Sequence, residues 1–145
     1  MPSQRHIVAG CLGGLALSLL AVGVESETVA RHVVQVFPAI VALVIAVRRP
    51  EWGALAAIPI FLFWTIIVIF IWLYQLGLTH VITGQFTTFE LVLTIFMAGF
   101  SIAGIAASAR SIEAPTWSHR AAVVIVFALV GAVQAATMRV AFLFG

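Results

Sequence analysis

Residues 52–79 read WGALAAIPIFLFWTIIVIFIWLYQLGLT and contain no charged side chain over 28 residues. A helix needs about 20 apolar residues to cross the hydrocarbon core of a bilayer, so this stretch is long enough to span a membrane. Trp52 and Trp72 lie 20 residues apart, which is about 30 Å along an α-helix and matches the separation of the two interfacial aromatic belts. The stretch therefore predicts a transmembrane helix with a tryptophan near each end.

The rest of the chain is similarly apolar. Of its 145 residues, 63% are hydrophobic and 8% are charged, and the mean hydropathy is +1.22. A soluble domain carries roughly a quarter charged residues, and a small domain buries only about two-thirds of the surface of its unfolded chain. These values exclude a water-soluble globule and a disordered chain. The single cysteine, Cys11, excludes a disulfide scaffold, and a scattered net charge of +2 gives no indication of a nucleic-acid partner.

Uncharged segments elsewhere in the chain predict four more spans. We place the five spans at residues 7–24, 29–47, 52–78, 89–109 and 120–140. The second span reaches the required length if Arg31 snorkels to the interface. Because the spans do not alternate polar and apolar residues as barrel strands do, we predict an all-α, polytopic membrane protein, a single domain built as a bundle of five transmembrane helices. The first span has an alternative interpretation as a cleaved signal peptide, which would leave four helices.

The arginines predict the orientation of the chain. With the N-terminus in the cytoplasm, the cytoplasmic segments hold Arg5, Arg48, Arg49, Arg110 and Arg120, whereas the outer segments hold Arg31 and Arg139. This distribution follows the positive-inside rule and places the C-terminus outside. The absence of Lys, Asp and Asn fits a GC-rich genome, so we expect a bacterial inner membrane.

Small residues indicate which helices pack closely. They recur every four residues in the first, fourth and fifth spans, at Gly10, Gly14 and Ser18, at Gly99, Ala103 and Ala107, and at Ala128, Ala132 and Ala136. Such stripes allow helix backbones to approach each other in lipid. Residues 58–74 contain no Gly, Ala or Ser, so we expect the third span to meet lipid or a partner over much of its surface.

Two loops share a pattern that would indicate an internal repeat. Residues 25–32 and 113–120 both carry Glu, Thr and a His–Arg pair at matching offsets. The first two and last two spans would then form an inverted repeat around the third, an arrangement typical of transporters. The alternative is chance, since helix starts favour Thr and interfaces favour Arg.

Polar residues converge on the predicted outer side. Glu90 and Arg139 each border a long apolar run, where a charge is costly unless it is paired or snorkels. Because the fourth and fifth spans are antiparallel and joined by a short connection, we predict a Glu90–Arg139 ion pair; two independent snorkelling charges are the alternative. The other members of this outer polar cluster are Gln35, Tyr74, Gln75, His80 and Gln134. The glutamines fit interhelical hydrogen bonds or, alternatively, a polar vestibule open to the outside.

No pattern for catalysis or cofactor binding is present. The four histidines, His6, His32, His80 and His119, fall at span ends without an i, i+4 pair or an HExxH motif. No GxSxG, P-loop or dinucleotide-binding fingerprint occurs. We therefore predict no catalytic residue, no metal site and no cofactor.

The leading functional hypothesis is non-enzymatic. We expect a small subunit or accessory protein of a membrane assembly, surrounded by the lipid bilayer and packed as a homo-oligomer or within a larger complex. A small transporter or channel with its site at the outer polar cluster is the alternative. A membrane enzyme that uses Glu90 or His80 on a lipid or quinone is third.

Overall fold

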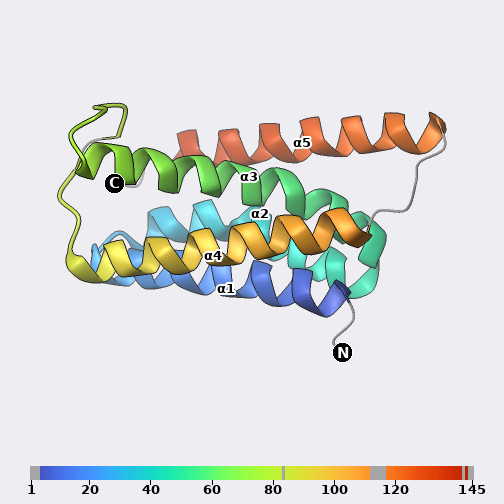
Figure 1. The fold of residues 1–145 in the computed structure, drawn as a ribbon, viewed down its shortest axis with the longest axis horizontal. Coiled ribbons are helices and arrows are strands. Elements are labelled where there is room, and N and C mark those ends of the chain that lie inside the picture. The colour runs from blue at the N-terminus through green and yellow to red at the C-terminus, as the bar shows by residue number, and fades with distance from the viewer. Residues whose placement is uncertain (1–3, 83, 112–116, 142, 144–145) are drawn as a thin grey trace.

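The computed structural model of the protein describes residues 4–82, 84–111, 117–141 and 143, with the backbone alone at 117–120 and 122–123. The five helices in Figure 1 are α1 (Gln4–Glu25), α2 (Val29–Arg48), α3 (Pro50–Gln75), α4 (Thr88–Ser111) and α5 (Trp117–Ala141). Each is long and apolar enough to cross a membrane. The predicted all-α bundle of five spans is confirmed. Since α1 begins at one end of the bundle and α5 finishes at the other (Figure 1), successive helices alternate in direction.

The connections are short where the chain turns between neighbouring helices. Arg49 alone separates α2 from α3, and Pro50 takes the first helical position of α3, where a missing N–H costs nothing. The first and third helices are each followed by a residue with a left-handed backbone, Glu27 (φ 56) and Gly77 (φ 70). This conformation lets the N–H groups that follow reach back to the last helical carbonyls.

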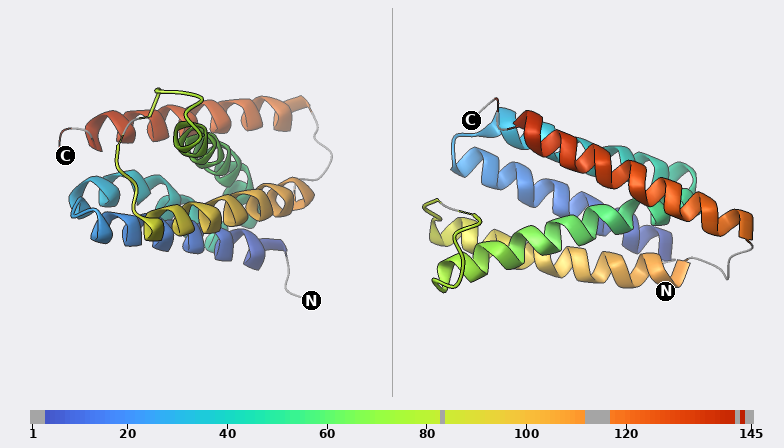
Figure 2. Two further views of the ribbon diagram at one scale, coloured as in Figure 1. Left: turned by 60° about the vertical axis from the view of Figure 1, so that its left-hand side comes forward. Right: turned by 90° about the horizontal axis from the view of Figure 1, so that it is seen from above.

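The helices are not equally central. In the part of the chain that the structure describes, α3 contacts all four other helices, whereas α5 contacts only α2 and α3. Figure 2 shows α5 lying outside the other four helices, with α1 and α4 on the far side of the bundle. Of the spanning segments, α3 is 56% buried and α5 is 11% buried. The fold is therefore a four-helix core with one peripheral helix.

Helix α4 packs against both α1 and α3, and its pairing with α3 follows a regular pattern. One row of buried side chains on α3 recurs with alternating spacings of four and three residues, at Ala57, Phe61, Trp64, Val68 and Ile71. One row of buried residues on α4 follows the same alternation, at Glu90, Thr94, Met97, Ser101, Gly104 and Ser108. This spacing keeps one narrow face of each helix against its partner, as in a coiled coil.

Two contacts fix the register of this pairing. The Phe61 ring occupies the space where a side chain on Gly104 would lie, and the Trp72 Nε1–H donates to Thr94 Oγ1 at 2.9 Å. In the antiparallel register that these contacts set, Trp64 lies level with Ser101 and Ala57 with Ser108. At two steps of this pairing a large side chain of α3 thus meets a small residue of α4, Phe61 at Gly104 and Trp64 at Ser101. We call this pairing of the two faces the α3–α4 seam.

The prediction that the third span meets lipid or a partner over much of its surface was wrong, because 56% of its spanning window is buried inside the bundle. Residues 58–74 are bulky, but Phe61 and Trp64 are accommodated by small residues that α4 supplies. The first turns of α3 also contain small buried residues, Gly53, Ala54, Ala56 and Ala57. Only one face of α3 is left exposed, at Leu62, Ile66 and Ile69.

The prediction of the small-residue stripe in the first span is only partly correct. Gly14 lies against the Phe100 ring of α4 and Ser18 is buried, but Gly10 is exposed. In α4 the packing line runs through Ser101, Gly104 and Ser108; of the predicted stripe, Ala107 is buried whereas Gly99 and Ala103 are exposed. In α5 the whole predicted stripe, Ala128, Ala132 and Ala136, is exposed. A helix has 3.6 residues per turn, so residues spaced strictly four apart drift around its surface. A row with alternating spacings of four and three residues stays on one face, and this row forms the seam.

Candidate functional site

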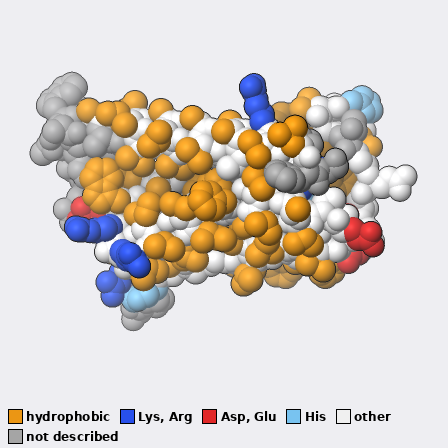
Figure 3. Space-filling view, turned by 180° about the vertical axis from the view of Figure 1, so that it is seen from behind, with side chains coloured by type: hydrophobic (Ala, Val, Ile, Leu, Met, Phe, Trp, Pro, Cys, Tyr) orange, Lys and Arg blue, Asp and Glu red, His pale blue; other side chains and the backbone are white. Residues whose placement is uncertain are grey.

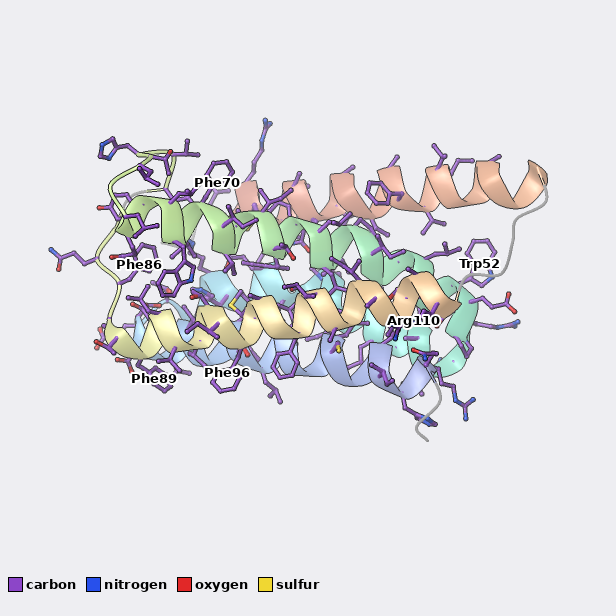
Figure 4. All side chains as sticks on the ribbon, viewed as in Figure 1. Trp52, Phe70, Phe86, Phe89, Phe96 and Arg110 are labelled. Atoms are coloured by element: carbon purple, nitrogen blue, oxygen red, sulfur yellow. The ribbon has the colours of Figure 1, made fainter. Side chains whose placement is uncertain are left out.

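Polar side chains gather where the turn between α1 and α2 meets the start of α4. We call this group the α1–α2–α4 polar cluster; it consists of Ser26, Thr28, His32, Thr87 and Glu90. Only Glu90 of these residues was predicted as a site residue. The cluster lies at the end of the bundle opposite to the α2–α3 turn, on the side where Figure 4 labels Phe86 and Phe89.

Glu90 is held by a reciprocal pair of hydrogen bonds at the start of α4. The Thr87 N–H donates to Glu90 Oε2 at 2.8 Å, and the Glu90 N–H donates to Thr87 Oγ1 at 3.2 Å. This is a capping box, in which two otherwise unpaired N–H groups of the first turn are satisfied. The carboxylate is only 7% exposed and lies at the positive end of the helix dipole, which stabilises its charge.

A directional chain of hydrogen bonds orients His32. Ser26 Oγ donates to the Val22 carbonyl at 2.7 Å, so it accepts from the Thr28 hydroxyl, 2.7 Å away. Because the Thr28 hydroxyl donates its proton to Ser26, Thr28 Oγ1 can only accept a further hydrogen bond. His32 Nδ1 lies 3.1 Å from both Thr28 Oγ1 and the Thr28 carbonyl oxygen. Both oxygens must therefore accept from an Nδ1–H, which fixes the tautomer of the neutral ring and leaves the lone pair on Nε2.

The Glu90 carboxylate lies within electrostatic range of the His32 ring. Gly23 allows this placement, because a side chain there would collide with the first side-chain atoms of His32. The half-buried imidazole and the buried carboxylate come from helices far apart in the sequence. Chemically, such a pair can hold a proton or attract a cation. Within residues 4–82, 84–111 and 117–141, no group of three His, Cys, Asp or Glu side chains could hold a metal ion.

Three predicted residues lie at the end of α3 and in the connection that follows. The Tyr74 ring packs edge-on against His80 at 6.3 Å and against Phe86 at 6.2 Å, measured between ring centroids. Gln75, by contrast, is exposed. The structure therefore joins Tyr74 and His80 in an aromatic group that orders the α3–α4 connection.

Of the three predicted glutamines of the spans, Gln35 and Gln134 are buried. Gln35 lies inside α2, and Gln134 is the one fully buried polar side chain that the structure describes in α5, at 0% exposure. Both amide atoms of Gln134 lack a hydrogen-bond partner among the described residues. Gln134 is therefore a point of unsatisfied polarity between α5 and the core.

The predicted Glu90–Arg139 ion pair was wrong. Helix α5 packs on α2 and α3 and makes no contact with α4 in the described part of the chain. Arg139 is exposed, and the Glu90 carboxylate is satisfied by the capping box instead. The same arrangement argues against the predicted inverted repeat, because α1 and α2 pack side by side whereas α4 and α5 do not.

Sequence reasoning missed His32 and Thr87. The signal for Thr87 was present as the T-x-x-E pattern of residues 87–90, which is typical of a capping box. His32 carried no comparable signal, because its approach to Glu90 depends on how α2 and α4 each pack against α1.

Comparison of the chain with protein-family models, with curated proteins and with solved structures found no match. No residue role is therefore carried over from a relative, and the proposals below depend on the geometry.

The polar cluster predicts that Glu90 is coupled to His32 and independent of Arg139. Glu90→Gln should lower the free energy of unfolding in detergent by about 1 kcal/mol, because it weakens the capping box and removes a charge at the helix start. Combined with His32→Gln, it should cost at least about 0.5 kcal/mol less than the sum of the single changes. Glu90→Gln with Arg139→Gln is the matched control and should be additive. Additivity in both pairs would remove the cluster as one site.

Proposed function

We propose that this protein is a non-enzymatic subunit or accessory protein of a bacterial inner-membrane assembly, and that α5 is the helix through which it packs. One observation carries the proposal. Within the described residues, helix α5 contacts only α2 and α3, and its alanine stripe, Ala128, Ala132 and Ala136, points away from the core. In lipid, where apolar surface alone does not drive association, small residues favour helix pairing because they let backbones approach.

The inner face of α5 supports the same proposal. The partly or fully buried residues of this helix lie on one face, at Val126, Val130, Gly131, Gln134, Thr137, Met138 and Ala141. The opposite face is exposed along its described length, so one side of α5 is used inside the chain and the other is free for a second helix. Association through a small-residue face would give this peripheral helix the burial that α1–α4 already have.

The interior of the first four helices favours a packing role over a conduit. One connected apolar cluster runs through α1, α2, α3 and α4, with fully buried residues such as Leu12, Leu15, Ala39, Ile60 and Phe61. A close-packed apolar cluster of this kind supports the subunit proposal, because transport would require a polar path between the two ends.

A small transporter or channel is the second candidate, because one specific observation favours it. The buried Glu90 carboxylate lies near His32, whose Nε2 makes no hydrogen bond within the described residues. Such a pair would suit capture of a proton or cation at one membrane surface. The candidate predicts cation-dependent uptake by proteoliposomes that Glu90→Gln abolishes; unchanged uptake would reject it.

For the orientation we propose that the α2–α3 turn faces the cytoplasm. The described arginines Arg5, Arg48, Arg49 and Arg110 belong to the end that holds this turn, whereas Glu25 and Glu27 belong to the other end. The positive-inside rule then places the end of α5 outside the cytoplasm.

A reporter that is active only in the cytoplasm tests the orientation. Fused after Gly145, it should be silent, and fused after Arg49 in a truncated chain it should be active. Strong activity of the full-length fusion would contradict the proposed orientation.

Photo-cross-linking in native membranes tests the role of α5. A photoreactive phenylalanine analogue at Ala132 should give a discrete product of higher mass, either a dimer of this chain or an adduct with another membrane protein. The matched control is the same analogue at Ala103, an exposed alanine on α4. Products of equal yield from both positions, or none from Ala132, would refute packing through α5.

A further inference from the structure

Arginines from four separate places in the sequence gather at one end of the bundle. Arg5 lies in the first turn of α1, Arg48 ends α2, Arg49 forms the link to α3, and Arg110 lies in the last turn of α4. All four are exposed. Figure 3 shows basic side chains gathered at this end of the molecule, and Figure 4 places Arg110 and Trp52 there together. We call this group the arginine collar.

Among the described residues, nothing neutralises the collar. None of its four arginines forms an ion pair with a described residue. Glu51 is the one carboxylate among the described residues of this end, so four positive charges face one negative charge.

A hollow in the collar lies beside an interfacial tryptophan. It has a volume of about 300 Å³ and is lined by Arg49, Pro50, Glu51 and Trp52. Trp52 is 46% exposed, and its distance along α3 from Trp72 places the indole at the level of the lipid headgroups. An arginine beside a tryptophan at this depth is suited to a lipid phosphate, because the guanidinium donates two parallel hydrogen bonds to its oxygens.

We propose that the arginine collar binds the headgroup of an anionic phospholipid, with the phosphodiester at Arg49 and the glycerol backbone of the lipid against Trp52. Arg48 and Arg110 add attraction for the net negative charge. Glu51 is placed to accept a hydrogen bond from a headgroup hydroxyl, such as those of phosphatidylglycerol. The excess of positive charge selects this lipid over zwitterionic phosphatidylethanolamine. This site is independent of the function proposed for α5.

Native mass spectrometry of the full-length, detergent-solubilised protein tests the proposal. With phosphatidylglycerol and phosphatidylethanolamine supplied at equal concentration, the protein should retain phosphatidylglycerol at least fivefold more strongly. Arg49→Gln should lower this affinity about fivefold, equivalent to about 1 kcal/mol. Arg139→Gln, which removes an exposed arginine from the opposite end, is the matched control and should leave it unchanged. If Arg49→Gln lowers the thermal stability of the lipid-free protein, Arg110→Gln provides the same comparison.

Inorganic phosphate distinguishes a lipid site from a site for a free anion. At millimolar concentration it should not displace the bound lipid, because it lacks the acyl chains and the contact with Trp52. Displacement by phosphate would assign the collar to a soluble phosphate compound. Equal retention of the two lipids, or equal loss in Arg49→Gln and Arg139→Gln, would overturn the proposal.

Discussion

The packing of large α3 side chains against small α4 side chains is the constraint on which the rest of the structure depends. Phe61 occupies the space above Gly104, and Trp64 lies level with Ser101. The lipid around transmembrane helices is as apolar as the helices themselves, so the hydrophobic effect does not hold them together. Close packing must therefore supply the stability that the exclusion of water gives to a soluble core. The small side chains that α4 supplies to the seam include the polar Thr94, Ser101 and Ser108, and the seam places α3 at the centre of the bundle.

The position of the polar cluster follows from the seam. Extending the buried line of α4 one step beyond Thr94 reaches Glu90, which is therefore turned towards the interior. The capping box satisfies this inward carboxylate from its own helix, and α2 brings His32 into range from the other side. The seam also excludes α5 from α4, so α5 remains peripheral and exposes its alanine face. The two functional proposals, at α5 and at the arginine collar, concern surfaces that the seam leaves uncovered.

The sequence predicted the number, type and approximate limits of the helices because spanning length and hydropathy are local properties. Helix partners are not local. The sequence does not distinguish the four-residue stripe at Gly99 and Ala103 from the line at Ser101 and Gly104 as the packing face of α4. The positions of the Phe61 and Trp64 rings on α3 do. The predicted Glu90–Arg139 contact failed for a similar reason, since adjacency in the chain does not make α4 and α5 neighbours. The capping box at Thr87 could have been predicted, whereas the approach of His32 required the packed bundle.

Leucine substitutions at two glycines of α4 test the seam most directly. Gly104→Leu would force a branched side chain into the space of the Phe61 ring, whereas Gly99 has no atom within 4 Å of the position of an added Cβ. Thermal unfolding in detergent should show that Gly104→Leu costs about 1–3 kcal/mol or prevents assembly. Gly99→Leu should be neutral or slightly stabilising, since Leu favours helix more than Gly. Equal stability of the two variants would contradict the account.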